Sequence, residues 1–85
     1  PEPRIGMVYR GIVEEVKYSR STFKVLGLKV LFLPGRTGMV FWRTVPRGTI
    51  ERYVPNERVS VRISNIQEKD GRQLYDLELI DPKLY

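Results

Sequence analysis

Short runs of β-branched and aromatic residues, separated by turn-forming residues, fill most of this 85-residue chain. Such runs are typical of β-strands, and no segment predicts a long helix. In so short a chain they predict a single all-β domain spanning residues 1–85, a five-stranded antiparallel barrel with a loose tail at residues 81–85. The strands are predicted at residues 7–18, 22–33, 38–43, 58–66 and 73–80, and one helical turn at residues 49–53.

Two irregularities predict where the first two strands bend. Val13 and Val16 lie three positions apart rather than two, which predicts a β-bulge near Glu14 and Glu15. Gly27 lies in the middle of the second run, where it either bends the strand or forms a hairpin turn that divides the run. The bend is the simpler interpretation because a stronger turn follows the run.

That stronger turn, and a second one near the end of the chain, consist of residue pairs with well-defined backbone preferences. Pro34 fixes φ at the first central position, and Gly35 accepts the positive φ of the second, so residues 33–36 predict a type II turn. Asp70 and Gly71 predict a tight hairpin turn between the last two strands.

Strand alternation assigns side chains to the core or to the outside. In the third strand we assign Val40 and Trp42 to the core, which leaves Phe41 and Arg43 side by side on the outer face as a candidate stacking platform. The opposite assignment, with Phe41 in the core and Trp42 exposed, remains an alternative. The other predicted core residues are Phe32, Val59, Val61, Ile63, Tyr75, Leu77 and Leu79.

The charge of the chain is concentrated in residues 17–52. This segment has eight basic residues and one acid, Glu51, a net charge of +7, whereas the rest has seven basic and nine acidic residues. Five aromatic residues lie among the cations. Clustered cations and rings suit a polyanion whose bases can stack, as in single-stranded nucleic acid. A basic surface that only keeps the protein soluble is the alternative, but such surfaces are usually mixed in sign.

Residue types that support catalysis are scarce. The chain has no histidine and no cysteine, so the commonest general base, the commonest thiol nucleophile and the best transition-metal ligands are missing. We therefore expect a non-enzymatic protein without cofactor or metal. The lack of cysteine fits a reducing compartment, and no apolar run approaches the roughly 20 residues that span a bilayer, so we expect a cytoplasmic protein with no membrane partner.

Four segments resemble the motifs of one known family in their order and spacing. Residues 5–16 are similar to G-x-V-x-x-G-x-V-x-x-V, residues 33–42 to L-P-G-K-x-G-L-V-H-I, and residues 54–63 to V-G-D-E-V-x-V-K-V. Residues 70–72 fall where the family has its last turn. These segments resemble the S-one RNA-binding domain, which is named for the largest protein of the small ribosomal subunit and is similar to the domain in polynucleotide phosphorylase.

The resemblance implies a Greek-key OB-fold barrel with single-stranded RNA across strands two and three. The family's binding histidine falls on Phe41 and its last-turn arginine on Arg72. The family's F-G-A-F aligns either with residues 26–29, which replaces both rings, or with the stretch that ends at Phe23, which keeps one. Residues 19–24 look like an insertion that lengthens the first hairpin. Because of these departures, we expect base stacking to contribute less of the affinity and phosphate contacts to contribute more.

We therefore predict mainly sequence-tolerant binding of single-stranded RNA, alone or within a ribonucleoprotein or a longer parent protein. Single-stranded DNA, or an acidic protein partner or ribosomal assembly, are alternatives because the sequence has no dedicated reader of the 2′-hydroxyl. Phosphates are expected on Arg20, Lys24, Lys29, Arg36 and Arg43, and bases on Phe41 and on Phe23 or Tyr18. Arg62 and Arg72 complete the candidate site.

Overall fold

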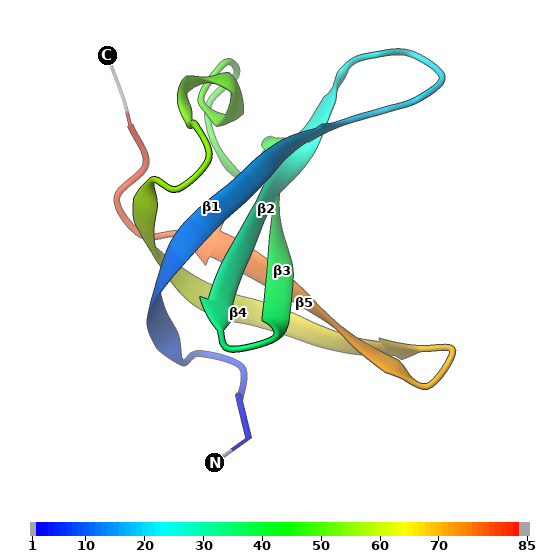
Figure 1. Cartoon of the computed structure of the whole chain (residues 1–85), viewed down its shortest axis with the longest axis vertical. Coiled ribbons are helices and arrows are strands. Elements are labelled where there is room, and N and C mark those ends of the chain that lie inside the picture. Colours follow the sequence, from blue (N-terminus) through cyan, green and yellow to red (C-terminus); the bar gives the residue numbers. More distant parts are fainter. Residues whose placement is uncertain (1, 84–85) are drawn as a thin grey trace.

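A computed structural model, which describes residues 2–83, has five strands in one closed sheet (Figure 1). The neighbours around the ring are β1, β2, β3, β5 and β4, with β4 next to β1. The strands are β1 (Val8–Tyr18), β2 (Val25–Leu33), β3 (Arg36–Phe41), β4 (Arg58–Lys69) and β5 (Arg72–Leu79). The all-β class and the five strands are thus confirmed, with shifted ends.

The sheet is mixed rather than antiparallel, which corrects the prediction. Four neighbouring pairs are antiparallel, but β3 and β5 are parallel. Strand directions cannot alternate all the way around a ring with an odd number of strands. One parallel pair is therefore required, and it falls where β5 closes the sheet against β3.

The predicted bulge in β1 is confirmed. Val13 lies opposite Val30 and Glu15 lies opposite Lys29, so Glu14 is the extra residue. A bulge bends its strand and increases the local twist. The bend allows β1 to pair with β4 over residues 8–12 and with β2 over residues 12–18, so one strand belongs to both sides of the ring.

Both predicted turns occur. Gly35 has a φ of 71°, and Asp70 and Gly71 have φ values of 54° and 75°, as tight turns at these positions require. Gly27 does not divide its run: it lies inside β2, opposite Phe41 of β3. A Cβ atom on this glycine would collide with the backbone carbonyl oxygen of Val40, so glycine allows the two strands to approach.

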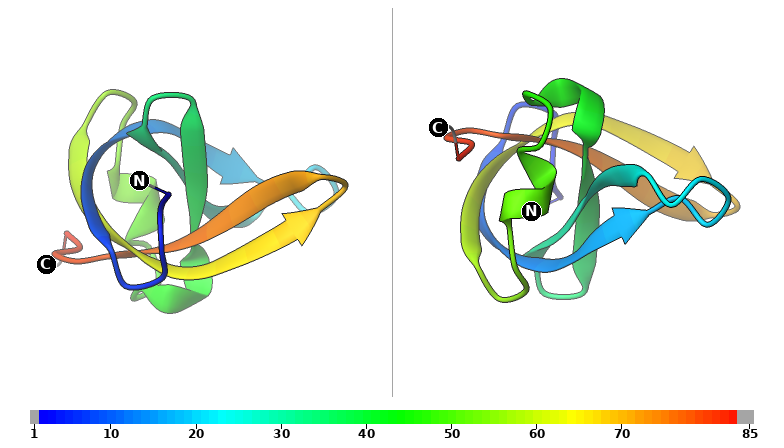
Figure 2. Two further views of the ribbon diagram at one scale, coloured as in Figure 1. Left: turned by 90° about the horizontal axis from the view of Figure 1, so that it is seen from below. Right: turned by 90° about the horizontal axis from the view of Figure 1, so that it is seen from above.

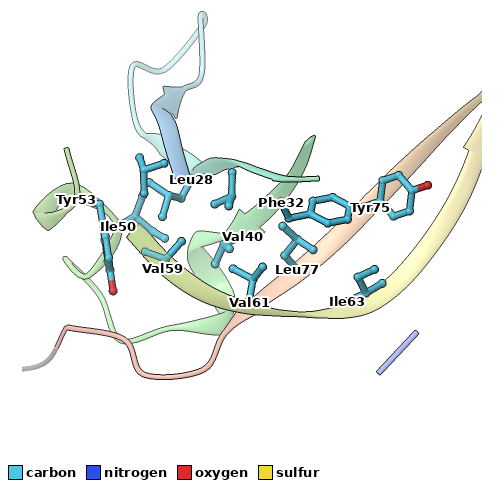
Figure 3. Packing of buried hydrophobic residues seen from close by; sticks show 12 residues of the cluster. Leu28, Phe32, Val40, Ile50, Tyr53, Val59, Val61, Ile63, Tyr75 and Leu77 are labelled. Carbon is cyan, nitrogen blue, oxygen red and sulfur yellow. The ribbon is translucent and has the colours of Figure 1, made fainter. Parts of the chain in front are cut away.

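The core fills the inside of the ring (Figure 3). Phe32 lies near its centre, with ring centroids 5.3 Å from Tyr9 and 5.1 Å from Tyr75. Most of the inward positions predicted from alternation are buried, and Leu79 packs against the core from its edge. The buried apolar residues are Val13, Leu28, Val30, Phe32, Val40, Ile50, Tyr53, Val59, Val61, Ile63, Tyr75 and Leu77.

The connection from β3 to β4 contains two 3-10 turns, η1 (Trp42–Thr44) and η2 (Ile50–Arg52). They lie across one end of the ring in the right-hand view of Figure 2. Ile50 is fully buried and extends the core to that end. The predicted helical turn at residues 49–53 is thus confirmed as η2, whereas η1 was not predicted. No helix in the described part of the chain is long and apolar enough to cross a membrane.

The end of the described chain is bound to this connection. The backbone N–H of Lys83 donates to the Tyr53 hydroxyl at 2.9 Å, and its ammonium group pairs with the Glu57 carboxylate. That ammonium group also lies 5.0 Å from the centroid of the Tyr53 ring. Of the loose tail expected at residues 81–85, residues 84 and 85 lie outside the described residues.

Replacing Gly27 should destabilise the protein because the new methyl group would force β2 and β3 apart. We expect Gly27→Ala to lower the free energy of unfolding by roughly 1–3 kcal/mol, the usual cost of overpacking. Chemical denaturation measures this change, and Leu26→Ala, at an exposed position of the same strand, is the matched control. Equal stability of Gly27→Ala and the wild type would contradict the close approach.

The ion pair of Glu57 should make stability depend on pH. The hydrogen bond from Lys83 is the main cause that lowers the pKa of Glu57; burial opposes it, and the hydrogen bond from the Val54 backbone N–H lowers the pKa by a smaller amount. A lowered pKa stabilises the fold above the unfolded value of about 4.3, and the contribution is lost as pH falls through the folded value.

We therefore expect Glu57→Gln to reduce stability at pH 7 by up to about 1 kcal/mol. The difference from the wild type should shrink below about pH 4 and vanish in stronger acid. Thermal unfolding across this range measures it, with Glu68→Gln as a control for the change in net charge. A difference that stays constant from pH 7 to pH 2 would rule out this role of the pair.

Candidate functional site

Three adjoining hollows run along one side of the ring. One hollow, of about 450 Å³, lies over β2, β3 and the β4–β5 hairpin, and we call it the central hollow because it lies between the end of β1, at Lys17, and that hairpin. It meets a second one of about 270 Å³ at Phe41, and this meets a third one of about 570 Å³ at Leu26 and Trp42. We call the three together the aromatic groove. The β1–β2 and β4–β5 hairpins project from the same side of the ring in Figures 1 and 2.

Strand register aligns the side chains of the central hollow. Lys17 of β1, Gly27 of β2 and Phe41 of β3 lie in one row, and paired residues point to the same face of a sheet. Because Gly27 has no side chain, the row has a gap between Lys17 and Phe41, and the Met39 sulfur lies 2.9 Å from where a Cβ atom of Gly27 would stand. Phe41 is 43% exposed, so its predicted outward orientation is confirmed.

A second row crosses the central hollow two residues further along β2 and β3. It joins Glu15 of β1, Lys29 of β2, Met39 of β3 and Asp76 of β5. Asp76 accepts a hydrogen bond from the Gln67 side chain at 3.1 Å. The parallel pairing of β3 with β5 therefore brings the last hairpin, with Arg72 and Leu74, to the wall of the same hollow.

The predicted burial of Trp42 is wrong: its side chain is 39% exposed and lines two of the hollows. β3 ends at Phe41, and the 3-10 turn that begins at Trp42 breaks the two-residue alternation. The Thr44 hydroxyl, which donates to the Phe41 carbonyl at 2.8 Å, helps to hold this turn. Pro46 was the available signal, because a central strand seldom continues into a proline.

The predicted platform of Phe41 and Arg43 on one strand face is also corrected. Arg43 lies in η1 rather than in β3, so strand parity does not place it. Its guanidinium carbon lies 5.7 Å from the centroid of the Trp42 ring, in the range of a cation–π contact. Arg43 and Phe41 still line the same small hollow, with Trp42 between them in the chain.

The β1–β2 loop holds its aromatic residue in an unusual conformation. Phe23 has a φ of 61° and is 79% exposed, and bulky side chains rarely adopt positive φ. Its N–H donates to the Ser19 carbonyl at 2.8 Å, and the Ser19 hydroxyl accepts from the N–H groups of Ser21 and Thr22. β2 begins at Val25, so residues 22–24, which were predicted as the start of this strand, belong to the loop instead.

Most of the candidate site residues gather along the aromatic groove, but three do not. Arg20 is exposed in the β1–β2 loop, and Arg36 lines a separate hollow that adjoins the groove. Arg62 lies on β4, away from β2 and β3, and donates to Glu78 at 2.8 Å. The residues in the groove are Tyr18, Phe23, Lys24, Lys29, Phe41, Arg43 and Arg72.

Sequence reasoning missed several residues that line the groove. They are Lys17, Leu26, Trp42, Arg47 and Leu74. Lys17 and Arg47 belong to the basic segment, but residues in loops and at strand ends have no alternation that would assign them to a face. Leu74 lies on the β4–β5 hairpin, which only the closed topology brings near β3.

Positive charge dominates the groove. Six basic residues line it, against the two acids Glu51 and Asp76. Two of the cations have exposed ion pairs, from Lys29 to Glu14 at 3.5 Å and from Lys17 to Glu15 at 3.9 Å. Such pairs contribute little, so these ammonium groups can exchange partners at small cost. The basic residues are Lys17, Lys24, Lys29, Arg43, Arg47 and Arg72.

The side chains that this surface offers are mainly aromatic rings and cations. Among residues 2–83, no three acidic side chains gather closely enough to hold a metal ion. Comparisons with models of protein families, with curated proteins and with solved structures found no match to this chain. Its chemistry therefore has to be inferred from the groove itself.

The exposure of Trp42 can be tested directly because it is the chain's single tryptophan. Its fluorescence should be quenched by acrylamide, and more strongly by iodide than by caesium, because Arg43 and Arg47 attract anions to this part of the groove. The control is the same protein in denaturant, where the difference between the two ions should diminish. Emission that resists every quencher would place Trp42 in the core.

Proposed function

We propose that this protein is a non-enzymatic binder of single-stranded RNA and that the strand lies along the aromatic groove. The observation that supports this most is the continuity of three hollows, each lined by both exposed rings and cations. Bases stack on aromatic faces and phosphates pair with lysine and arginine, so this combination suits a single strand rather than a duplex.

Each part of the groove has a separate role in this proposal. Phe41 and Trp42 offer faces to neighbouring bases, and Phe23 extends the stacking surface to the β1–β2 loop. Stacking contributes about 1–3 kcal/mol per base and tolerates any sequence. Lys17, Lys24 and the other cations hold phosphates, which makes the affinity depend on salt.

The same proposal assigns the ring to the Greek-key OB-fold and to the S-one family. Three features support it: the strand order with one parallel pair, the bulged β1 shared by both sides of the ring, and a groove over β2 and β3 between two hairpins. Phe41 and Arg72, at the family's histidine and arginine positions, both line the central hollow.

The departure from the family on strand two has a structural counterpart. The outward positions of β2 around the central hollow are Gly27 and Lys29, neither of which is aromatic. The exposed rings that remain include Phe41, which lines the central hollow, and Trp42 and Phe23, which line the other two hollows. We therefore expect limited sequence preference and affinity that comes largely from phosphates.

Titration with a short single-stranded RNA tests the proposal. Binding should quench or shift the fluorescence of Trp42 and shift the amide resonances of residues 17–52 and of the β4–β5 hairpin. The logarithm of the binding constant should fall linearly with the logarithm of the salt concentration. A matched single-stranded DNA and an RNA duplex are the comparisons. Equal affinity for DNA would widen the proposal to any single strand. No response to either strand would favour a protein partner.

Two substitutions should separate stacking from charge. Phe41→Ala should weaken binding by about 1–3 kcal/mol with an unchanged salt slope, whereas Lys24→Ala should reduce the slope by about 0.7, as for one lost phosphate contact. Their controls are Val54→Ala and Arg58→Ala, at exposed positions outside the groove. The groove would be the wrong surface if the controls had the same effects.

A further inference from the structure

A fourth hollow, of about 690 Å³, lies at the start of β3 beside the aromatic groove. Glu2, Arg36 and Arg72 are among its lining residues, and we call it the end pocket. Arg72 and Tyr75 line both the end pocket and the central hollow, so the two are continuous. A strand that follows the groove past Phe41 would therefore reach the end pocket next.

The guanidinium group of Arg36 is held in place by a core residue. One of its terminal nitrogens, Nη1, donates to the Tyr75 hydroxyl at 2.9 Å, and that hydroxyl donates to the Gln73 side-chain oxygen at 2.6 Å. Tyr75 is only 6% exposed and packs edge-on against Phe32. The packing of Tyr75 inside the closed sheet thus fixes the direction in which the Arg36 guanidinium group points.

The remaining contact of Arg36 is with a carboxylate. The same nitrogen donates to Glu2 at 3.1 Å, and the hydrogen bonds to Glu2 and then to Tyr75 raise the pKa of Arg36. The Glu2 side chain is 75% exposed and comes from the segment before β1. An ion pair this exposed contributes little, so the carboxylate can leave without disturbing the fold.

The end pocket holds more positive than negative charge. Arg72 faces it as well, and no carboxylate among residues 2–83 pairs with Arg72. Two guanidinium groups thus line the end pocket, and the Glu2 carboxylate pairs with only one of them, that of Arg36. Arginine pairs well with phosphate because its planar fork matches two phosphate oxygens, and a phosphate can take contacts from both side chains at once.

We propose that the end pocket is a phosphate subsite and that the Glu2 carboxylate occupies it in the free protein. A phosphate displaces Glu2 from Arg36 and bridges Arg36 and Arg72. The identity of this phosphate as part of a nucleic-acid strand rests on the proposed function, whereas the subsite itself requires only a phosphate group. Glu2 therefore acts as an intramolecular competitor that lowers affinity.

Titration with inorganic phosphate tests the subsite without any nucleic acid. The side-chain Nε–Hε resonances of Arg36 and Arg72 should shift together as phosphate is added. Glu2→Gln should bind phosphate roughly two- to fivefold more tightly, as expected for the loss of one exposed ion pair. Asp81→Asn makes the same change in net charge at a separate hollow near Tyr53, and this variant should bind phosphate as the wild type does.

Arg36→Lys provides a second variant in case the glutamine change alters the segment before β1. It keeps the charge but loses the fork, so phosphate should bind severalfold more weakly while thermal unfolding confirms that the ring is intact. The subsite is overturned if phosphate leaves the Arg36 and Arg72 resonances unshifted, or if Glu2→Gln and Asp81→Asn have equal effects.

Oligonucleotides then separate this inference from the proposed function. A single-stranded RNA with a terminal phosphate should bind more tightly than the same RNA without it if the subsite takes a strand end. Equal affinities, both raised in Glu2→Gln, would assign the subsite to an internal phosphodiester. Phosphate binding without RNA binding would support the subsite and reject the proposed function. RNA binding without phosphate binding would support the proposed function and reject the subsite.

Discussion

Closure of a ring by an odd number of strands is the constraint on which the other features depend. It requires one parallel pair, and the chain forms it between β3 and β5. β3 consequently has β2 on one side and the β4–β5 hairpin on the other. Arg72 and Tyr75, which follow that hairpin turn, thereby meet Arg36 at the start of β3. The groove and the end pocket exist because distant segments share this one strand.

Local backbone chemistry was predictable because it depends on neighbouring residues. The bulge at Glu14, the turn at Gly35 and the inward row from Val59 to Ile63 all follow from spacing and residue type. Alternation fails at Trp42 because it applies only while the strand continues, and η1 begins there. The parallel pair was missed because it follows from an odd number of strands closing into one ring, and no single segment of the sequence carries that information.

The candidate site was predictable in part for the same reason. Five of the eight basic residues in residues 17–52 line the aromatic groove, because β1, β2 and β3 are neighbours in the ring as well as in sequence. Arg72 reaches the groove only through the topology, and its assignment came from a resemblance rather than from its own surroundings. Arg62 shares the outward parity that the sequence predicted, but β4 directs it to another side.

The conformation of Phe23 has a consequence for the thermodynamics of any ligand that uses it. Its positive φ is unfavourable, and the loop hydrogen bonds around Ser19 maintain it in the free protein. The free energy needed to hold this backbone geometry is therefore part of the folding free energy, and association does not require it a second time. A loop whose backbone is already ordered loses less conformational entropy when a partner stacks on its ring. The β1–β2 loop is in this sense a preorganised element, and loosening it should weaken association without removing a single contact.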